Sequence, residues 1–145
     1  MLSTKLSKYV FEKTYHDTLM LLLRSESFLE NYSSQTELHD KPLYEARIDC
    51  EMTRITARLT RVMAWLLAQK ALYEGALPLE EAQSIKYQIV RDPFCLKDSL
   101  KGQERALPPT VKDLLSDSLD LYRRALVLCE NNFTISLDQK PESEN

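Results

Sequence analysis

The chain has 145 residues, the usual size of one domain, with 43% hydrophobic and 28% charged residues, the balance of an ordinary soluble protein. Its formal net charge of −3 argues against a dedicated nucleic-acid binder. Gly75 and Gly102 are its two glycines, which excludes a glycine-rich phosphate-binding loop.

The first predicted element is a helix over residues 9–32, preceded by a loose leader at residues 1–8. Its apolar positions follow the three-and-four spacing of a buried stripe, which Glu26 interrupts. They are Tyr15, Leu19, Leu22, Leu29 and Tyr32. The polar segment 31–42 ends in a proline and is predicted to be the loop that follows.

The second helix is predicted over residues 43–73, a stretch without glycine or proline, and Gly75 stands where a C-terminal cap is expected. Apolar residues repeat in this helix at steps of three and four, which predicts a heptad seam. They are Ile48, Met52, Ile55, Leu59, Val62 and Leu66. The C-terminal half is apolar on more than one face, which favours more than one packing partner and hence a second subunit.

Residues 76–107 are predicted to form an insert that begins with a short helix, because a proline followed by acids starts it, and that continues as irregular chain. A third long helix is expected over residues 109–131. Its heptad-like seam consists of Val111, Leu114, Ser118, Leu121, Ala125 and Leu128. The polar tail at residues 136–145 is expected to be disordered.

These elements predict an all-α fold: a bundle of three long helices with a short helical insert between the second and the third, in one domain over residues 1–135. No apolar segment reaches the length of a membrane span or of a secretory signal. We therefore expect a cytoplasmic protein without membrane contact.

No group of residues carries a recognisable catalytic or metal-binding pattern. His16-Asp17 and His39-Asp40 resemble the His-Asp pair of metal-dependent phosphohydrolases, but these sites need further histidine ligands and the chain has two histidines. Glu80 and Glu81 are adjacent and do not share a helix face. We expect no catalytic residue, metal or cofactor; an enzyme with an unfamiliar site around His16 is the alternative.

The three cysteines, Cys50, Cys95 and Cys129, are odd in number and widely spaced. Without a C-x-x-C pair, they indicate neither a zinc knuckle nor a dithiol redox site. Buried, reduced thiols are the expectation.

Arg54, Arg58 and Arg61 recur at helical spacing in the second helix and lead to Trp65, the single tryptophan. This row allows three interpretations. It is a solvated edge, partly paired within its own helix because Glu51 precedes Arg54 by three residues; a protein-binding face, because Arg and Trp are enriched at interface hot spots; or a nucleic-acid-binding face.

The stretch EMTRITARLTRVMAWLLAQKA at residues 51–71, with Glu74 and Gly75 after it, resembles the signature of the RcdA family (regulator of CtrA degradation), small alphaproteobacterial proteins. Weaker similarity covers most of residues 9–131. The resemblance implies a three-helix bundle that dimerises and acts without catalysis, as an adaptor that helps the ClpXP protease receive regulatory proteins during the cell cycle. Arg61 falls outside the family pattern.

The predicted function is therefore a non-catalytic adaptor in ClpXP-dependent proteolysis of cell-cycle proteins, which works through protein–protein contacts. Its expected partners are ClpXP-associated proteins, the delivered substrates and a second copy of the chain. The protein-binding residues implied by the match are Glu51, Arg54, Thr56, Arg58 and Trp65. The alternative is a nucleic-acid-associated helical protein that uses the basic face of the second helix.

Overall fold

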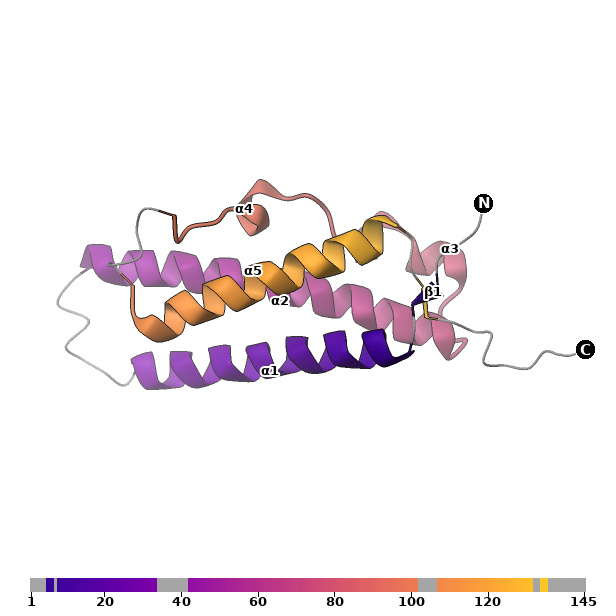
Figure 1. Cartoon of the computed structure of the whole chain (residues 1–145), viewed down its shortest axis with the longest axis horizontal. Helices are drawn as coiled ribbons and strands as arrows, with labels where there is room; N and C mark the ends of the chain where they lie inside the picture. Colours follow the sequence, from indigo (N-terminus) through magenta and orange to yellow (C-terminus); the bar gives the residue numbers. More distant parts are fainter. Residues whose placement is uncertain (1–4, 7, 34–41, 102–106, 132–133, 136–145) are drawn as a thin grey trace, which may run out of the picture.

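The computed structural model describes residues 5–6, 8–33, 42–101, 107–131 and 134–135, and Figure 1 shows them as a bundle of three long helices. The long helices are α1 (Lys8–Ser33), α2 (Pro42–Tyr73) and α5 (Pro109–Glu130). The segment between α2 and α5 contains α3 (Leu79–Ala82), η2 (Ile85–Tyr87) and α4 (Pro93–Leu96). The predicted all-α class, with three long helices and a short helical insert, is confirmed.

A short pair of parallel strands joins the two ends of the described chain. β1 (Lys5–Leu6) pairs with β2 (Thr134–Ile135). The prediction of a loose leader over residues 1–8 is therefore wrong at β1 and at Lys8, which begins α1. A two-residue strand is too short to leave an alternating pattern in the sequence. The predicted tail, residues 136–145, lies outside the described residues.

The heptad seam predicted for α2 forms the centre of the core. All six of its residues are at most 3% exposed. The helix ends at the predicted glycine: Gly75 has a φ of +78°, and the Ala76 amide donates to the Ala71 carbonyl at 2.8 Å. This is the arrangement in which a glycine in the left-handed region closes a helix.

The buried stripe of α1 differs from the predicted one. Its positions follow steps of three and four and are Phe11, Thr14, Thr18, Leu21, Ser25, Phe28 and Tyr32. Leu19 and Leu29, which were expected to be buried, are 39% and 40% exposed. Thr14 and Thr18 donate from their hydroxyls to main-chain carbonyls of α1, at 2.8 Å and 2.7 Å. A hydroxyl that bonds to a carbonyl of its own helix can be buried. A sequence pattern that counts only apolar residues as buried positions does not find this stripe.

Helix α5 completes the bundle, and each of the three long helices contacts the other two. Its predicted seam is buried except for Leu128, which is half-buried against the core. Within the described residues, no helix is long and apolar enough to cross a membrane.

Candidate functional site

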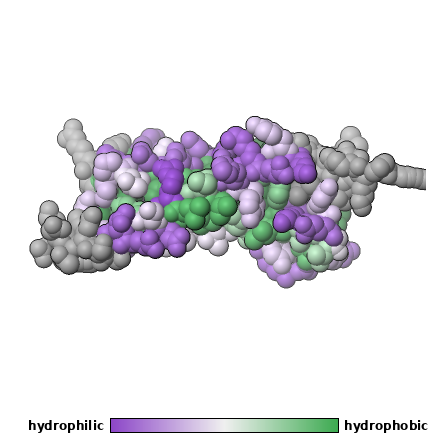
Figure 2. Space-filling model, turned by 90° about the horizontal axis from the view of Figure 1, so that it is seen from below, coloured by the Kyte–Doolittle hydropathy of each residue, from purple (hydrophilic) through white to green (hydrophobic). Residues whose placement is uncertain are grey.

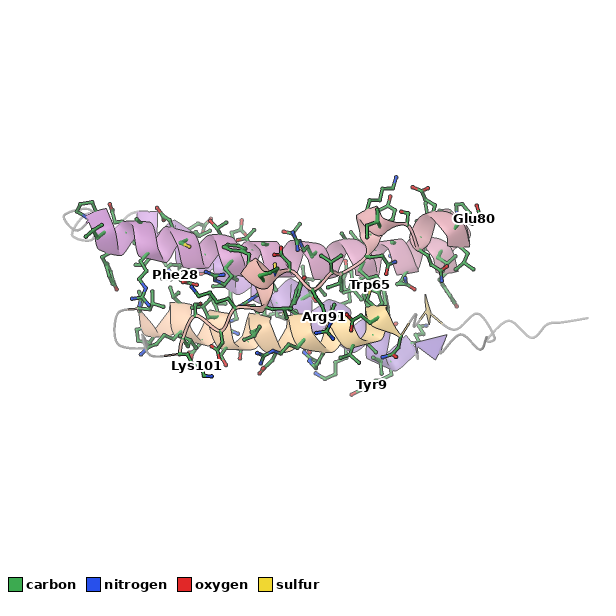
Figure 3. The ribbon with its side chains drawn as sticks, turned by 90° about the horizontal axis from the view of Figure 1, so that it is seen from above. Tyr9, Phe28, Trp65, Glu80, Arg91 and Lys101 are labelled. Atoms are coloured by element: carbon green, nitrogen blue, oxygen red, sulfur yellow. The ribbon has the colours of Figure 1, made fainter. Side chains whose placement is uncertain are left out.

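Residues 88–101, here called the strap, lie lengthwise over the junction of α2 and α5, as Figure 3 shows from above. The strap contains one helical turn, α4. Asp92 caps this turn by accepting a hydrogen bond from the Phe94 amide at 2.9 Å, and Pro93 occupies the first helical position, where no amide hydrogen is needed. The rest of the strap has no regular hydrogen bonding, so its position depends on side chains of α2 and α5.

Arg58 of α2 is 1% exposed and holds the strap against α5. Its Nε donates to the Cys95 carbonyl at 2.7 Å, and its Nη2 donates to the Lys97 carbonyl at 2.7 Å. Its Nη1 donates to the Leu115 carbonyl at 3.0 Å and to the Ser118 hydroxyl at 2.9 Å. One planar guanidinium therefore joins the strap, α2 and α5.

Arg54, one turn earlier, is 4% exposed and holds the strap together with Glu51. Its Nε donates to Glu51 Oε1 at 2.9 Å and its Nη1 to the Phe94 carbonyl at 2.5 Å. The guanidinium carbon lies 4.3 Å from the centre of the Phe94 ring, a cation–π contact. Glu51 Oε1 also accepts a hydrogen bond from the Ser99 hydroxyl at 2.7 Å. The pair thus fixes the strap at two points five residues apart.

The two guanidiniums place more positive than negative charge in this region, because Glu51 is the one buried carboxylate among the described residues. Burial, followed by the charge of Arg54, lowers the pKa of Arg58 to about 10. Arg58 is still protonated at neutral pH, where its charge strengthens the hydrogen bonds to the carbonyls. The arrangement has a desolvation cost, which these hydrogen bonds offset.

Further contacts fasten the strap along its length. Arg61, partly exposed, forms an ion pair with Asp92, and the Tyr122 hydroxyl donates to the Val90 carbonyl at 2.6 Å. The Ile89 amide donates to the Cys129 sulfur at 3.3 Å. Side chains of α2 and α5 therefore bind main-chain groups from residue 89 to residue 97.

The structure buries four of the five predicted protein-binding residues, Glu51, Arg54, Arg58 and Trp65, inside the chain. Thr56 is exposed on another face of α2. The interpretation of the arginine row as a solvated edge is wrong for Arg54 and Arg58, while the predicted pairing of Arg54 with Glu51 is confirmed. Direct contact of these five residues with a partner stays a prediction.

The burial of Arg54 and Arg58 removes two of the three arginines on which the nucleic-acid alternative depends. Arg54 and Arg58 direct their guanidiniums to groups of the chain itself, and Arg61 is paired with Asp92. In this arrangement the first two cannot contact a phosphate backbone, which is the contact that supplies non-specific affinity for nucleic acid.

The partners of the arginines escaped sequence reasoning because most of them are main-chain carbonyls, which every residue carries. One signal was present. Ser118 occupies a position of the apolar seam of α5, and in the structure it is fully buried and accepts from Arg58. A polar residue in an apolar seam indicated a buried polar partner.

Of the two histidines, the structure describes His16. His16 lines a shallow hollow of about 700 Å³ between α1 and α5, where Asp17 is paired with Lys13 and Arg124. Among the described residues, no group of three His, Cys, Asp or Glu side chains is placed to hold a metal ion. His39 and Asp40 lie outside them.

Two of the three cysteines meet the expectation of buried thiols. Cys95 and Cys129 are buried, and burial raises the pKa of both, which keeps them protonated at neutral pH. Cys50 is exposed, contrary to the expectation.

Comparison with known proteins places the chain in a family. A family model described as "Protein of unknown function (DUF1465)" matches residues 2–144. No curated protein matches, and no solved structure matches.

Proposed function

The chain belongs to the DUF1465 family, and we propose that this member is a non-catalytic, cytoplasmic adaptor that helps the ClpXP protease receive regulatory proteins of the cell cycle. The resemblance of residues 51–71 to the RcdA family supports this function. One structural observation carries it: the residues of that resemblance, Arg54 and Arg58, brace an irregular surface segment through its main-chain carbonyls.

Side chains of α2 and α5 bind the carbonyls of the strap on the side that faces the bundle. Several side chains of the strap are therefore exposed on its other side. Val90 and Phe94 are 39% and 37% exposed, and Arg91, Lys97 and Lys101 are exposed beside them. A segment held in one conformation loses less conformational entropy on binding a partner than a free loop does. Loops positioned by a rigid scaffold are the usual carriers of recognition. The buried arginines would thus serve partner binding by shaping this surface.

The adaptor proposal predicts that regulatory proteins of the cell cycle persist longer when the gene for this protein is deleted. Half-lives are measured after translation arrest, and a pull-down on ClpX tests for association. Lys97→Glu, a charge reversal on the outer side of the strap, is expected to lengthen the half-lives. Lys70→Glu, at an exposed lysine of α2, is the matched control and should leave them unchanged. Unchanged half-lives in the deletion, together with no association with ClpX or its partners, would refute the adaptor.

The exposed apolar residues of α1 favour a second copy of the chain as a partner. Leu19, Met20 and Leu23 are 39%, 41% and 48% exposed, and Figure 2 shows hydrophobic surface in the middle of the side formed by α1. These residues lie near the midpoint of α1 (Lys8–Ser33). An antiparallel two-fold pairing would bring the patch onto itself, as an isologous dimer requires.

The homodimer predicts a mass twice the 16.9 kDa of the chain in light scattering. Leu23→Glu is expected to shift the protein toward the monomer, because two carboxylates would be desolvated at the centre of the interface. Far-UV circular dichroism should be unchanged, since Leu23 is exposed in the single chain. Val127→Glu, at a 52% exposed apolar residue of α5, is the control. A wild-type mass of one chain at micromolar concentration would contradict the dimer.

A further inference from the structure

The outward side of α2 is unusual for an exposed helix face, which normally carries charge. Between Asp49 and Lys70, the exposed or half-buried residues on this side are small or apolar. They are Thr53, Thr56, Ala57, Thr60, Met63, Ala64 and Leu67. The charge at the edge belongs to Arg61, which is paired with Asp92. Small side chains allow a second helix to approach closely, because the distance between helix axes is set by the side chains at the contact.

Two adjoining hollows run beside this face. One, of about 550 Å³, is lined mainly by α2; the other, of about 420 Å³, is lined mainly by α1. Both are lined by Leu29 and Thr56, so together they form one groove between the C-terminal half of α1 and the middle of α2, here called the α1/α2 groove. From Asp49 to Arg61 it extends about 18 Å at 1.5 Å per helical residue. That length accommodates about three turns of a helix.

Ser25 lies beside the α1/α2 groove with its hydroxyl oxygen buried. It is 5% exposed and lines the groove, and its hydroxyl has no hydrogen-bond partner within the described part of the chain. Thr14 and Thr18, on the same stripe of α1, both bond to carbonyls of their own helix. An unmade hydrogen bond at a buried polar group costs about 1–3 kcal/mol. The oxygen of this hydroxyl is covered by the chain itself, so a molecule in the groove does not reach it.

The rim of the α1/α2 groove is acidic. Glu26 and Glu30 of α1 and Asp49 of α2 line it, and the basic residue that lines it, Arg61, is paired with Asp92. Glu26 and Asp49 form no ion pair with any residue that the structure describes. A ligand with positive charge along one edge would therefore complement the groove, and a nucleic acid would be repelled.

We propose that the α1/α2 groove binds a helix of a partner protein, with a small or apolar seam against Thr56 and Leu29 and with Lys or Arg along the edge that faces Glu26 and Asp49. A helix is favoured over an extended peptide because its main-chain groups are paired internally, and a groove between two helices offers no strand edge to bond them. This inference rests on the proposed adaptor function and names the chemistry of a partner.

The probe is a fluorescein-labelled amphipathic peptide about 18 residues long, with a leucine seam and lysines along one edge. A matched peptide carries glutamates in place of the lysines. Anisotropy is measured with the full-length protein, and amide chemical shifts are mapped by NMR. The lysine peptide is expected to bind at least about tenfold more tightly than the glutamate peptide. The largest shifts should fall in residues 22–30 and 49–61.

Thr56→Arg tests the location, because it places bulk and positive charge in the groove. It is expected to weaken the lysine peptide by about tenfold or more, and Thr60→Arg should act in the same direction. Ser116→Arg, at an exposed residue of α5, adds the same charge elsewhere and should leave binding unchanged. Both threonines are exposed, so the variants should retain the wild-type circular dichroism spectrum.

The proposal is overturned if the lysine peptide does not bind, if both peptides bind equally, or if Thr56→Arg acts no differently from Ser116→Arg. It is also overturned if Thr56→Arg converts a dimer to a monomer in light scattering, because the occupant is then a second copy. Half-lives separate this inference from the adaptor. Half-lives that depend on the protein but not on Thr56 refute the groove alone. Peptide binding, without any effect of the protein on half-lives and without association with ClpX or its partners, refutes the adaptor alone.

Discussion

Replacing Arg58 with alanine is expected to lower the free energy of unfolding by about 3–5 kcal/mol. The substitution leaves the Cys95, Lys97 and Leu115 carbonyls without the donors that Arg58 provides, in a region where water cannot replace them fully. Loss of the desolvation cost, which the lowered pKa of Arg58 reflects, offsets part of this. Urea unfolding monitored by circular dichroism measures the change.

Two substitutions serve as controls for Arg58→Ala. Arg58→Lys keeps the charge, but one ammonium group cannot reach all the acceptors of a planar guanidinium, so an intermediate loss is expected. Arg61→Ala removes a partly exposed ion pair and should cost at most about 1 kcal/mol. If Arg58→Ala costs no more than Arg61→Ala, the buried network does not hold the strap. Hydrogen exchange should also show the strap amides of Arg58→Ala exchanging faster than those of α2.

Replacing Trp65 with alanine is expected to lower the free energy of unfolding by about 3–5 kcal/mol, because it removes the largest fully buried side chain in the core. Leu67→Ala is the matched control. Leu67 lies two residues further along α2 and is 48% exposed, so its truncation should cost less than about 1 kcal/mol. Thermal and urea unfolding measure both variants.

The Trp65 substitution also separates packing from direct partner contact. Trp65→Phe retains most of the buried ring, so it should retain most of the stability and all of the partner binding if Trp65 acts through the core. A variant with unchanged stability and abolished pull-down would show that Trp65 meets a partner directly. A small loss of stability in Trp65→Ala would contradict its role in the core.

The sequence predicted the buried face of a helix correctly where that face consists of apolar residues alone. In α2 every seam position is aliphatic or methionine, and the ends of that helix were predicted within one residue. In α1 the seam includes three buried polar residues, Thr14, Thr18 and Ser25, and the hydroxyls of the two threonines bond to carbonyls of their own helix. A pattern that scores hydrophobicity alone then favours Leu19 and Leu29, which are exposed.

The candidate site was predictable in part. The spacing of Glu51 and Arg54 indicated their pairing, because residues three apart on a helix are neighbours. The burial of Arg54 and Arg58 was not predictable, since it depends on where residues 88–101 return to the bundle. That return is made by an irregular segment whose carbonyls carry no residue-specific signal, and its contact with α2 spans about forty positions of sequence.

Arg58 ties the strap to a helix that follows it in the chain. Two acceptors of Arg58, the Leu115 carbonyl and the Ser118 hydroxyl, belong to α5, which follows the strap in the chain. A nascent chain that ends before α5 lacks both, together with the hydroxyl of Tyr122 that binds Val90. Regions with few internal hydrogen bonds open as separate units. The bracing of the strap is therefore complete only when α5 is in place, so we expect a partner that binds the outer surface of the strap to bind incomplete chains more weakly.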